Sequence, residues 1–106
     1  MRYRYMRILV FFDLPTLTSN DGKAYRGFHK FLIKNGFIMQ QYSVYSKLAL
    51  NGTQAESVKA LLRKNVPQNG LVQCIEITEK QYADIEYMAG KGQTKILDSD
   101  KRWTEY

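Results

Sequence analysis

Short apolar segments alternate with segments of helical periodicity along this chain. Residues 7–14 form a short, apolar, β-prone run that stops before Pro15, a pattern typical of a buried central strand. Residues 16–22 are rich in turn and capping residues, which indicates a loop. Residues 23–35 have an apolar position at every third or fourth place and are followed by Gly36, so a helix is predicted there. Its apolar positions are Tyr25, Phe28, Phe31 and Leu32.

The middle of the chain repeats this alternation. Residues 37–49 are strand-like with a turn-prone centre, which predicts two short strands joined by a tight connection. A second helix is predicted to start at Thr53, whose hydroxyl can cap it while Glu56 completes a capping box three residues later. Residues 71–78 then predict a further strand.

The end of the chain predicts two more elements. A short helix is expected over residues 79–89, followed by a glycine-rich break and a last short strand over 94–98. The order is therefore β-α-β-β-α-β with an extra C-terminal strand. This is the α+β, ferredoxin-like arrangement, an antiparallel sheet with both main helices on one face. We expect one domain over residues 1–98 and a polar C-terminal tail over 99–106.

A four-stranded sheet with a single helical layer leaves its second face uncovered. Aromatic residues are frequent in the predicted strands, so something should cover that face, and a second copy of the chain is the simplest cover. These aromatic residues are Phe11, Phe12, Phe37, Tyr42 and Tyr45. The sequence therefore predicts a homodimer, in which the extra strand adds to the edge of its own sheet or of its partner's sheet.

The charge of the chain changes the picture of its surface. The formal net charge is +6, and residues 1–64 carry eleven Lys and Arg against three acids, whereas residues 65–106 carry five against seven. Such an asymmetry favours binding of a polyanion such as nucleic acid, although basic charge also serves solubility alone. The chain has no apolar run near the roughly 18 residues of a membrane span. The sequence shows no signal-type segment and has one cysteine, Cys74, which we expect to be an inert core residue. These features predict a cytoplasmic location with no membrane contact.

Three clusters of cations could contact nucleic acid. Those in the first predicted helix recur every three to four residues and would form one stripe, which is either a phosphate-binding surface or a solvated helix face. The stripe contains Lys23, Arg26, Lys30 and Lys34; the N-terminal cluster contains Arg2, Arg4 and Arg7; and a weaker cluster contains Lys59, Arg63 and Lys64. None of these patterns carries base-specific information, so contacts to the backbone are expected.

Asp13 is the candidate catalytic residue. It ends the apolar run of the first strand, and a carboxylate there is costly to bury without a partner. Either Asp13 accepts hydrogen bonds from the loop that follows, or it helps to bind Mg²⁺ or Mn²⁺. Two copies of Asp13 near a dimer axis would make a metal-binding pair. The sequence lacks a zinc-type Cys/His cluster and a phosphate-binding Gly-rich loop, and His29 is expected to be a solvated or backbone-contacting helix residue and not a catalytic one.

Several of these segments together resemble the smaller of the two universal CRISPR spacer-acquisition proteins, most closely the form from single-effector (type II) systems. They are residues 12–16, 23–26 with Phe28 and 31–32, 36–37, 41–45 and 78–82. The resemblance implies a ferredoxin-like dimer whose C-terminal strand reaches across to the partner. It also implies that Asp13 is the metal-dependent nuclease residue, and that the dimer carries duplex DNA and bridges the larger CRISPR integrase. Gly27 stands where relatives often have a cation.

Two other functions remain open at this point. Small basic dimers can cleave RNA in the manner of a toxin, in which case RNA is the ligand and Asp13 is essential. A ferredoxin-like regulatory module would instead bind a small ligand at the dimer interface, and residues 16–22 offer the one loop that could serve it. The residues and the resemblance agree on the dimer, the basic surface and Asp13, but they leave open whether the protein is mainly an enzyme or a scaffold.

Overall fold

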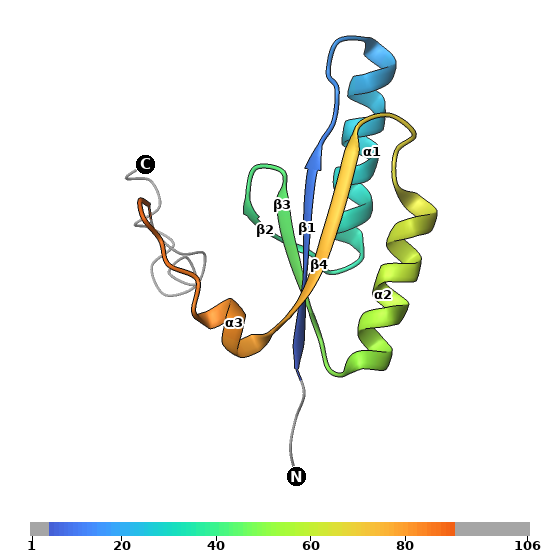
Figure 1. The fold of residues 1–106 in the computed structure, drawn as a ribbon. Coiled ribbons are helices and arrows are strands. Elements are labelled where there is room, and N and C mark those ends of the chain that lie inside the picture. Colours follow the sequence, from blue (N-terminus) through green and yellow to red (C-terminus); the bar gives the residue numbers. More distant parts are fainter. Residues whose placement is uncertain (1–4, 91–106) are drawn as a thin grey trace.

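The computed structural model describes residues 5–90, and the predicted strand 94–98 and tail lie outside these residues. The elements follow the predicted order (Figure 1). They are β1 (Met6–Asp13), α1 (Ser19–Lys34), β2 (Ile38–Gln41), β3 (Val44–Ala49), α2 (Gly52–Asn65), β4 (Leu71–Thr78) and α3 (Glu79–Ala83). The division into a domain over residues 1–98 and a tail stays a prediction.

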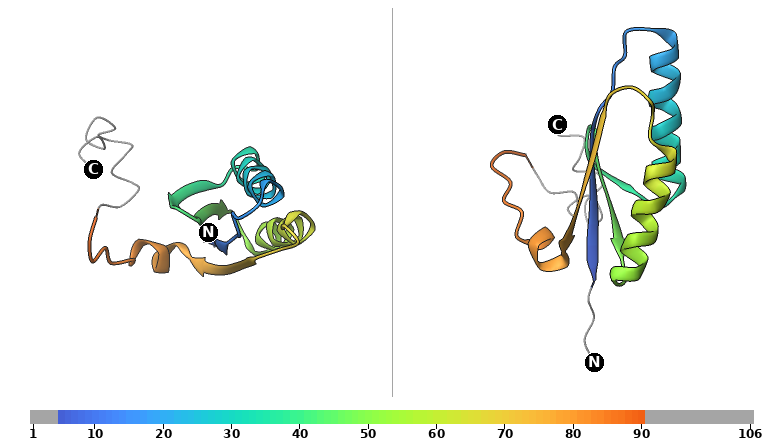
Figure 2. Two further views of the ribbon diagram at one scale, coloured as in Figure 1. Left: turned by 90° about the horizontal axis from the view of Figure 1, so that it is seen from above. Right: turned by 45° about the vertical axis from the view of Figure 1, so that its right-hand side comes forward.

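The four strands form one antiparallel sheet in the order β2-β3-β1-β4. The apolar strand β1 lies in the centre, where Val10 is paired with Tyr45 of β3 and Cys74 of β4. Helices α1 and α2 cover one face of the sheet, and α3 lies on the other side (Figure 2). The ferredoxin-like α+β fold predicted from the sequence is therefore confirmed.

The hydrophobic core fills the space between the sheet and the two main helices. Alternate residues of β1 point into it, because side chains of a strand alternate between the two faces. Phe12 packs edge-on against Phe28 of α1 with 5.1 Å between ring centroids, and its ring stacks on Tyr45 at 5.7 Å. The core consists of Ile8, Val10, Phe12, Phe28, Leu32, Phe37, Tyr45, Ala49, Ala55, Val58 and Leu62.

The face of the sheet away from α1 and α2 is apolar and partly exposed, and we call it the open face. The residues of β1 that alternate with the core positions lie here, among them Phe11, which is 38% exposed. Exposed residues of the other strands on this face include Leu48 of β3 and Leu71 and Ile75 of β4. An apolar sheet face of this kind is commonly covered by another layer in the working protein.

Two helix starts differ from the prediction. Helix α1 begins at Ser19, because the Thr18 hydroxyl accepts a hydrogen bond from the Asp21 amide while the Asp21 carboxylate accepts one from the Thr18 amide. Part of the predicted loop 16–22 is therefore helix. Helix α2 is capped by Asn51 and not by Thr53, so the predicted capping box with Glu56 is wrong.

Two further predictions are corrected near the C-terminal side. The last helix ends at Ala83, six residues earlier than expected. Cys74 is exposed and not a core residue, because β4 is an edge strand and this thiol lies beside α2 in a shallow groove that also contains Lys59 and Val66. Among the described residues, no helix combines the length and the apolar character needed to cross a membrane.

Candidate nucleic-acid interface and the Asp13 strand end

The four cations predicted on the first helix share one face of α1. Lys23, Arg26, Lys30 and Lys34 are all exposed. At 3.6 residues per turn they fall within an arc of about 80°. The core residues Phe28 and Leu32 lie on the opposite side of the helix. We call this surface the α1 stripe, and it faces away from both the core and the open face.

No carboxylate of the described residues forms an ion pair with the α1 stripe. Asp21, the nearest acid in the sequence, accepts hydrogen bonds from the amides of Leu17 and Thr18 at 3.2 and 3.1 Å. Its charge therefore serves the helix N-terminus, where the helix dipole favours an anion. Four exposed like charges at this spacing repel one another, and a phosphate backbone would relieve the repulsion.

Gly27 lies on the same side of α1 and leaves room beside the stripe. A Cβ atom built at Gly27 meets no other atom within 4 Å. The residue has no positive φ that would require glycine. The position can therefore accept a long side chain without displacing its neighbours.

The third cation cluster is partly neutralised. Lys59 forms ion pairs with Glu76 at 2.8 Å and with Glu56 at 2.9 Å. These bonds raise the pKa of Lys59 well above its usual range, the bond to Glu76 most strongly. The bond to Lys59 likewise lowers the pKa of Glu56. Arg63 and Lys64 remain exposed in the last turn of α2.

The N-terminal cluster is not a free cationic surface where the structure describes it. Arg2 and Arg4 lie outside the described residues. Arg7 forms a two-point ion pair with Glu79, with donor–acceptor distances of 3.0 and 2.6 Å. Its guanidinium also lies 4.2 Å from the ring centroid of Tyr82. Both interactions join residues more than seventy positions apart, and no local pattern in the sequence could have indicated them.

Asp13 is exposed at the end of β1, on the open-face side of the strand. A shallow depression of about 180 Å³ surrounds it, with Ser43, Leu71 and Gln73 among the lining residues. In the following loop the amides of Leu17 and Thr18 donate to Asp21, and no described group donates a hydrogen bond to the Asp13 carboxylate. The interpretation in which Asp13 accepts hydrogen bonds from this loop therefore receives no support. The carboxylate is therefore available to a ligand from outside the described chain.

His29 does not lie with Asp13. Its Nδ1 forms a 2.5 Å hydrogen bond with the hydroxyl of Tyr45, which is 1% exposed. Burial, and to a smaller extent the nearby Tyr25, raise the pKa of Tyr45, so its hydroxyl keeps its proton. His29 is therefore half-buried and bonded to a side chain, and it is not the solvated or backbone-contacting residue that was expected.

The described part of the chain does not bring metal ligands together within one subunit. Among residues 5–90, no group of three or more His, Cys, Asp or Glu side chains could hold a cation. Mg²⁺ is usually bound through one or two carboxylates plus water and phosphate oxygens, and Asp13 supplies one exposed carboxylate within the described residues.

The chain is thus a small α+β protein with a ferredoxin-like sheet. It has one basic helix face, an open apolar face and an aspartate at a strand end. Comparison with known proteins then gives the family. The model of "CRISPR associated protein Cas2" matches residues 6–85, and the chain belongs to this family. The family resemblance inferred from the sequence is confirmed, and the single-effector form stays a prediction.

Two relatives and one solved structure illustrate the similarity. The chain is 50% identical over 97 residues to the "CRISPR-associated endoribonuclease Cas2" of Treponema denticola, covering 92% of this chain and 96% of the relative. It is 46% identical over 97 residues to the protein of the same name from Streptococcus mutans, covering 92% and 89%. A solved structure titled "Crystal structure of cas2" superposes with a TM-score of 0.56 at 18% identity, over 85% of this chain and 92% of that one.

Proposed function

We propose that this CRISPR-associated protein acts in adaptation as a homodimer that binds the backbone of duplex DNA and bridges the larger CRISPR integrase. The α1 stripe is the observation that carries the proposal. It offers four exposed cations without an ion-pair partner among the described residues, in a line along one helix. Contacts of this kind attract phosphate irrespective of base sequence. The cytoplasm, where such a complex would act, suits a chain with one exposed thiol.

The open face supports the homodimer. It exposes Phe11, Leu48, Leu71 and Ile75 on three adjacent strands, and helices α1 and α2 are both on the other side. Packing two such faces together would remove apolar surface from water in both copies at once. It would also bring two strand ends carrying Asp13 into the same assembly.

Asp13 supports a second, conditional activity as an endonuclease. Two Asp13 carboxylates, one from each copy, would hold Mg²⁺ or Mn²⁺. When bound, such a cation stabilises negative charge on a phosphodiester and activates water. Because relatives carry "endoribonuclease" in their names, RNA is the second candidate substrate beside DNA. The structural role in integration remains the main function in this proposal.

The stripe proposal is tested with the double variant R26A/K30A. Duplex affinity should fall about equally on unrelated sequences, and the slope of log affinity against log salt should become shallower by about 0.9 for each lost phosphate contact. Integration of a spacer by the co-purified integrase should fall in parallel. The matched control is Lys80→Ala, which removes an exposed cation that pairs with Asp84 and lies far from α1 in the fold. Unchanged affinity in R26A/K30A would show that the stripe is a solvated helix face.

A further inference from the structure

Arg7 is held on the open face by contacts that reach from β1 to α3. Its Nε and Nη2 donate hydrogen bonds to the two carboxylate oxygens of Glu79 at 3.0 and 2.6 Å. Its guanidinium carbon lies 4.2 Å from the centroid of the Tyr82 ring. The Arg7 side chain is 15% exposed and that of Glu79 is 38% exposed. A two-point, partly buried ion pair of this kind is fixed in geometry, unlike a single surface contact.

The same contacts continue from α3 to β2 and β3. The Tyr82 hydroxyl donates to the side-chain amide oxygen Oε1 of Gln40 at 2.7 Å, and the fully buried Ser46 hydroxyl donates to the same oxygen at 2.5 Å. Helix α3, which follows β4 directly in the chain, is therefore bonded to β1 and β2, and through Gln40 it is linked to Ser46 of β3. We call Arg7, Gln40, Glu79 and Tyr82 the α3 latch.

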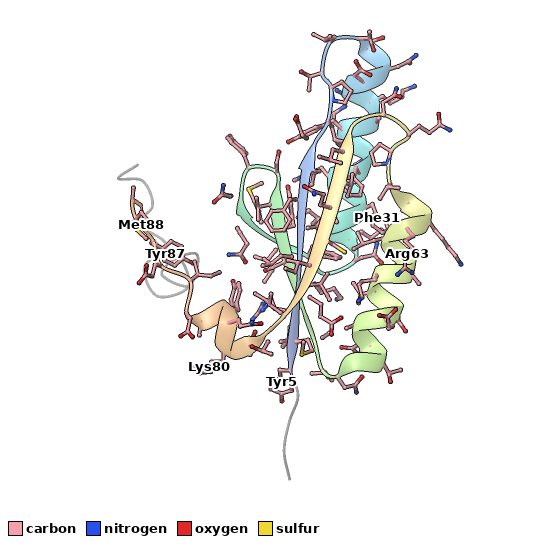
Figure 3. The ribbon with its side chains drawn as sticks, viewed as in Figure 1. Tyr5, Phe31, Arg63, Lys80, Tyr87 and Met88 are labelled. Atoms are coloured by element: carbon pink, nitrogen blue, oxygen red, sulfur yellow. The ribbon has the colours of Figure 1, made fainter. Side chains whose placement is uncertain are left out.

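The α3 latch determines where the chain goes after the sheet. Thr78 ends β4 and at once caps α3, in a capping box with Gln81, so no loop separates strand from helix. The segment 84–90 then leaves on the side opposite to α1 and α2 (Figure 2). It carries apolar side chains away from the core, with Tyr87 50% and Met88 86% exposed (Figure 3).

We propose that Arg7 is a positioning residue that directs the segment 84–90 onto a second copy of the chain. This role rests on the homodimer proposed above, and it makes Arg7 a residue on which the stability of that dimer depends. Exposed apolar residues of the segment stand on the same side of the sheet as the exposed apolar residues of the open face. The chain continues for a further sixteen residues beyond Gly90, enough to reach a neighbouring subunit. In this proposal Arg7 acts within the protein and does not contact phosphate.

Reversal and exchange of the latch charges test this role in the full chain. Arg7→Glu and Glu79→Arg should each raise the dimer dissociation constant about tenfold or more, because like charges then face each other and α3 is released. The double variant R7E/E79R should return the constant to within about threefold of the wild type, since the pair is restored with its ends exchanged. Lys80→Gln is the control, because it breaks the exposed Lys80–Asp84 pair of the same helix and should change nothing.

Sedimentation equilibrium measures the dimer constant, and hydrogen exchange of residues 79–85 reports the release of α3. If a charge reversal prevents folding, Glu79→Gln and Tyr82→Phe weaken the α3 latch with little change of shape and should raise the constant by a smaller factor. A wild-type protein that is monomeric at micromolar concentration would refute the homodimer itself. A wild-type dimer whose constant is unaffected by every latch variant would refute the latch alone. Loss of duplex affinity that R7E/E79R does not restore would show that Arg7 binds phosphate.

Discussion

Adding a cation at Gly27 is the sharpest test of the α1 stripe, because the substitution should strengthen duplex binding and not weaken it. In Gly27→Lys the new ammonium would join the stripe four residues after Lys23 and three before Lys30. The backbone is helical there, φ is not positive, and a Cβ meets no atom within 4 Å. The substitution should therefore add charge without displacing a neighbour.

The effect of Gly27→Lys on folding should be small. Removing a glycine from a helix interior stabilises the fold by about 0.5–1 kcal/mol. Two new like-charge neighbours at helical spacing cost about 0.2–0.5 kcal/mol each. The free energy of unfolding should therefore change by less than about 0.6 kcal/mol in either direction. The neutral variant Gly27→Ala should gain the full amount from helix propensity.

The effect on duplex binding should be much clearer. One extra phosphate contact in each copy steepens the slope of log affinity against log salt by about 0.9, and hence by about 1.8 for a dimer that uses both stripes. Fluorescence anisotropy on two unrelated duplexes between 50 and 200 mM salt would measure it. Gly27→Gln is the matched control, with a long side chain but no charge. An unchanged slope in Gly27→Lys, with the fold and the dimer intact, would refute the proposal that the stripe faces phosphate.

Three further predictions concern other parts of the chain. Asp13→Asn should abolish any Mg²⁺- or Mn²⁺-dependent cleavage in a nuclease assay yet leave duplex affinity, the dimer and spacer integration unchanged, and loss of integration would contradict a mainly structural role. The pKa of Glu56 is lowered and that of Lys59 is raised by their pairing. The pair therefore stabilises the fold at pH values above 4.5, the usual pKa of Glu, and below 10.5, the usual pKa of Lys. Lys59→Met should accordingly lower Tm most between these pH values, with the difference from wild type shrinking as pH falls through the Glu56 pKa; a pH-independent difference would contradict this. Gly70→Ala should cost about 1–3 kcal/mol in denaturant unfolding, because φ is +98° and a Cβ would lie 2.8 Å from the Asp13 carbonyl oxygen, whereas Gly52→Ala, which meets nothing, should cost little.

The order of elements could be predicted from the sequence because its signals are local. Periodicity of apolar residues identified β1 and the core face of α1, and both hold in the structure. Helix starts were less certain, since neighbouring residues compete for the cap: Asn51 and Thr53 can both cap a helix, and the structure uses Asn51. Cys74 was misplaced because its exposure depends on β4 being an edge strand, which is a property of topology and not of the apolar run around it.

The features of the candidate site likewise fall into those that local sequence signals predict and those that depend on distant residues. The α1 stripe could be predicted because its members are neighbours on a single helix, and helical spacing alone places them together. The state of the other cations depends on partners distant in the sequence: Arg7 meets Glu79 seventy-two positions away, and Lys59 meets Glu76 seventeen away. A count of basic residues therefore overestimates the surface that is free to bind phosphate.

The two faces of the sheet separate the proposed tasks of the protein. The open face carries exposed apolar residues such as Phe11 and Leu71, the α3 latch and the Asp13 strand end, whereas the α1 stripe lies on the outer side of the helical layer. Packing two open faces together would bury their apolar residues and leave both stripes exposed at opposite sides of the assembly. Dimer formation and backbone binding then draw on different residues. It follows that substitutions in the α3 latch should act on assembly, and substitutions in the stripe on nucleic acid, with little overlap between the two.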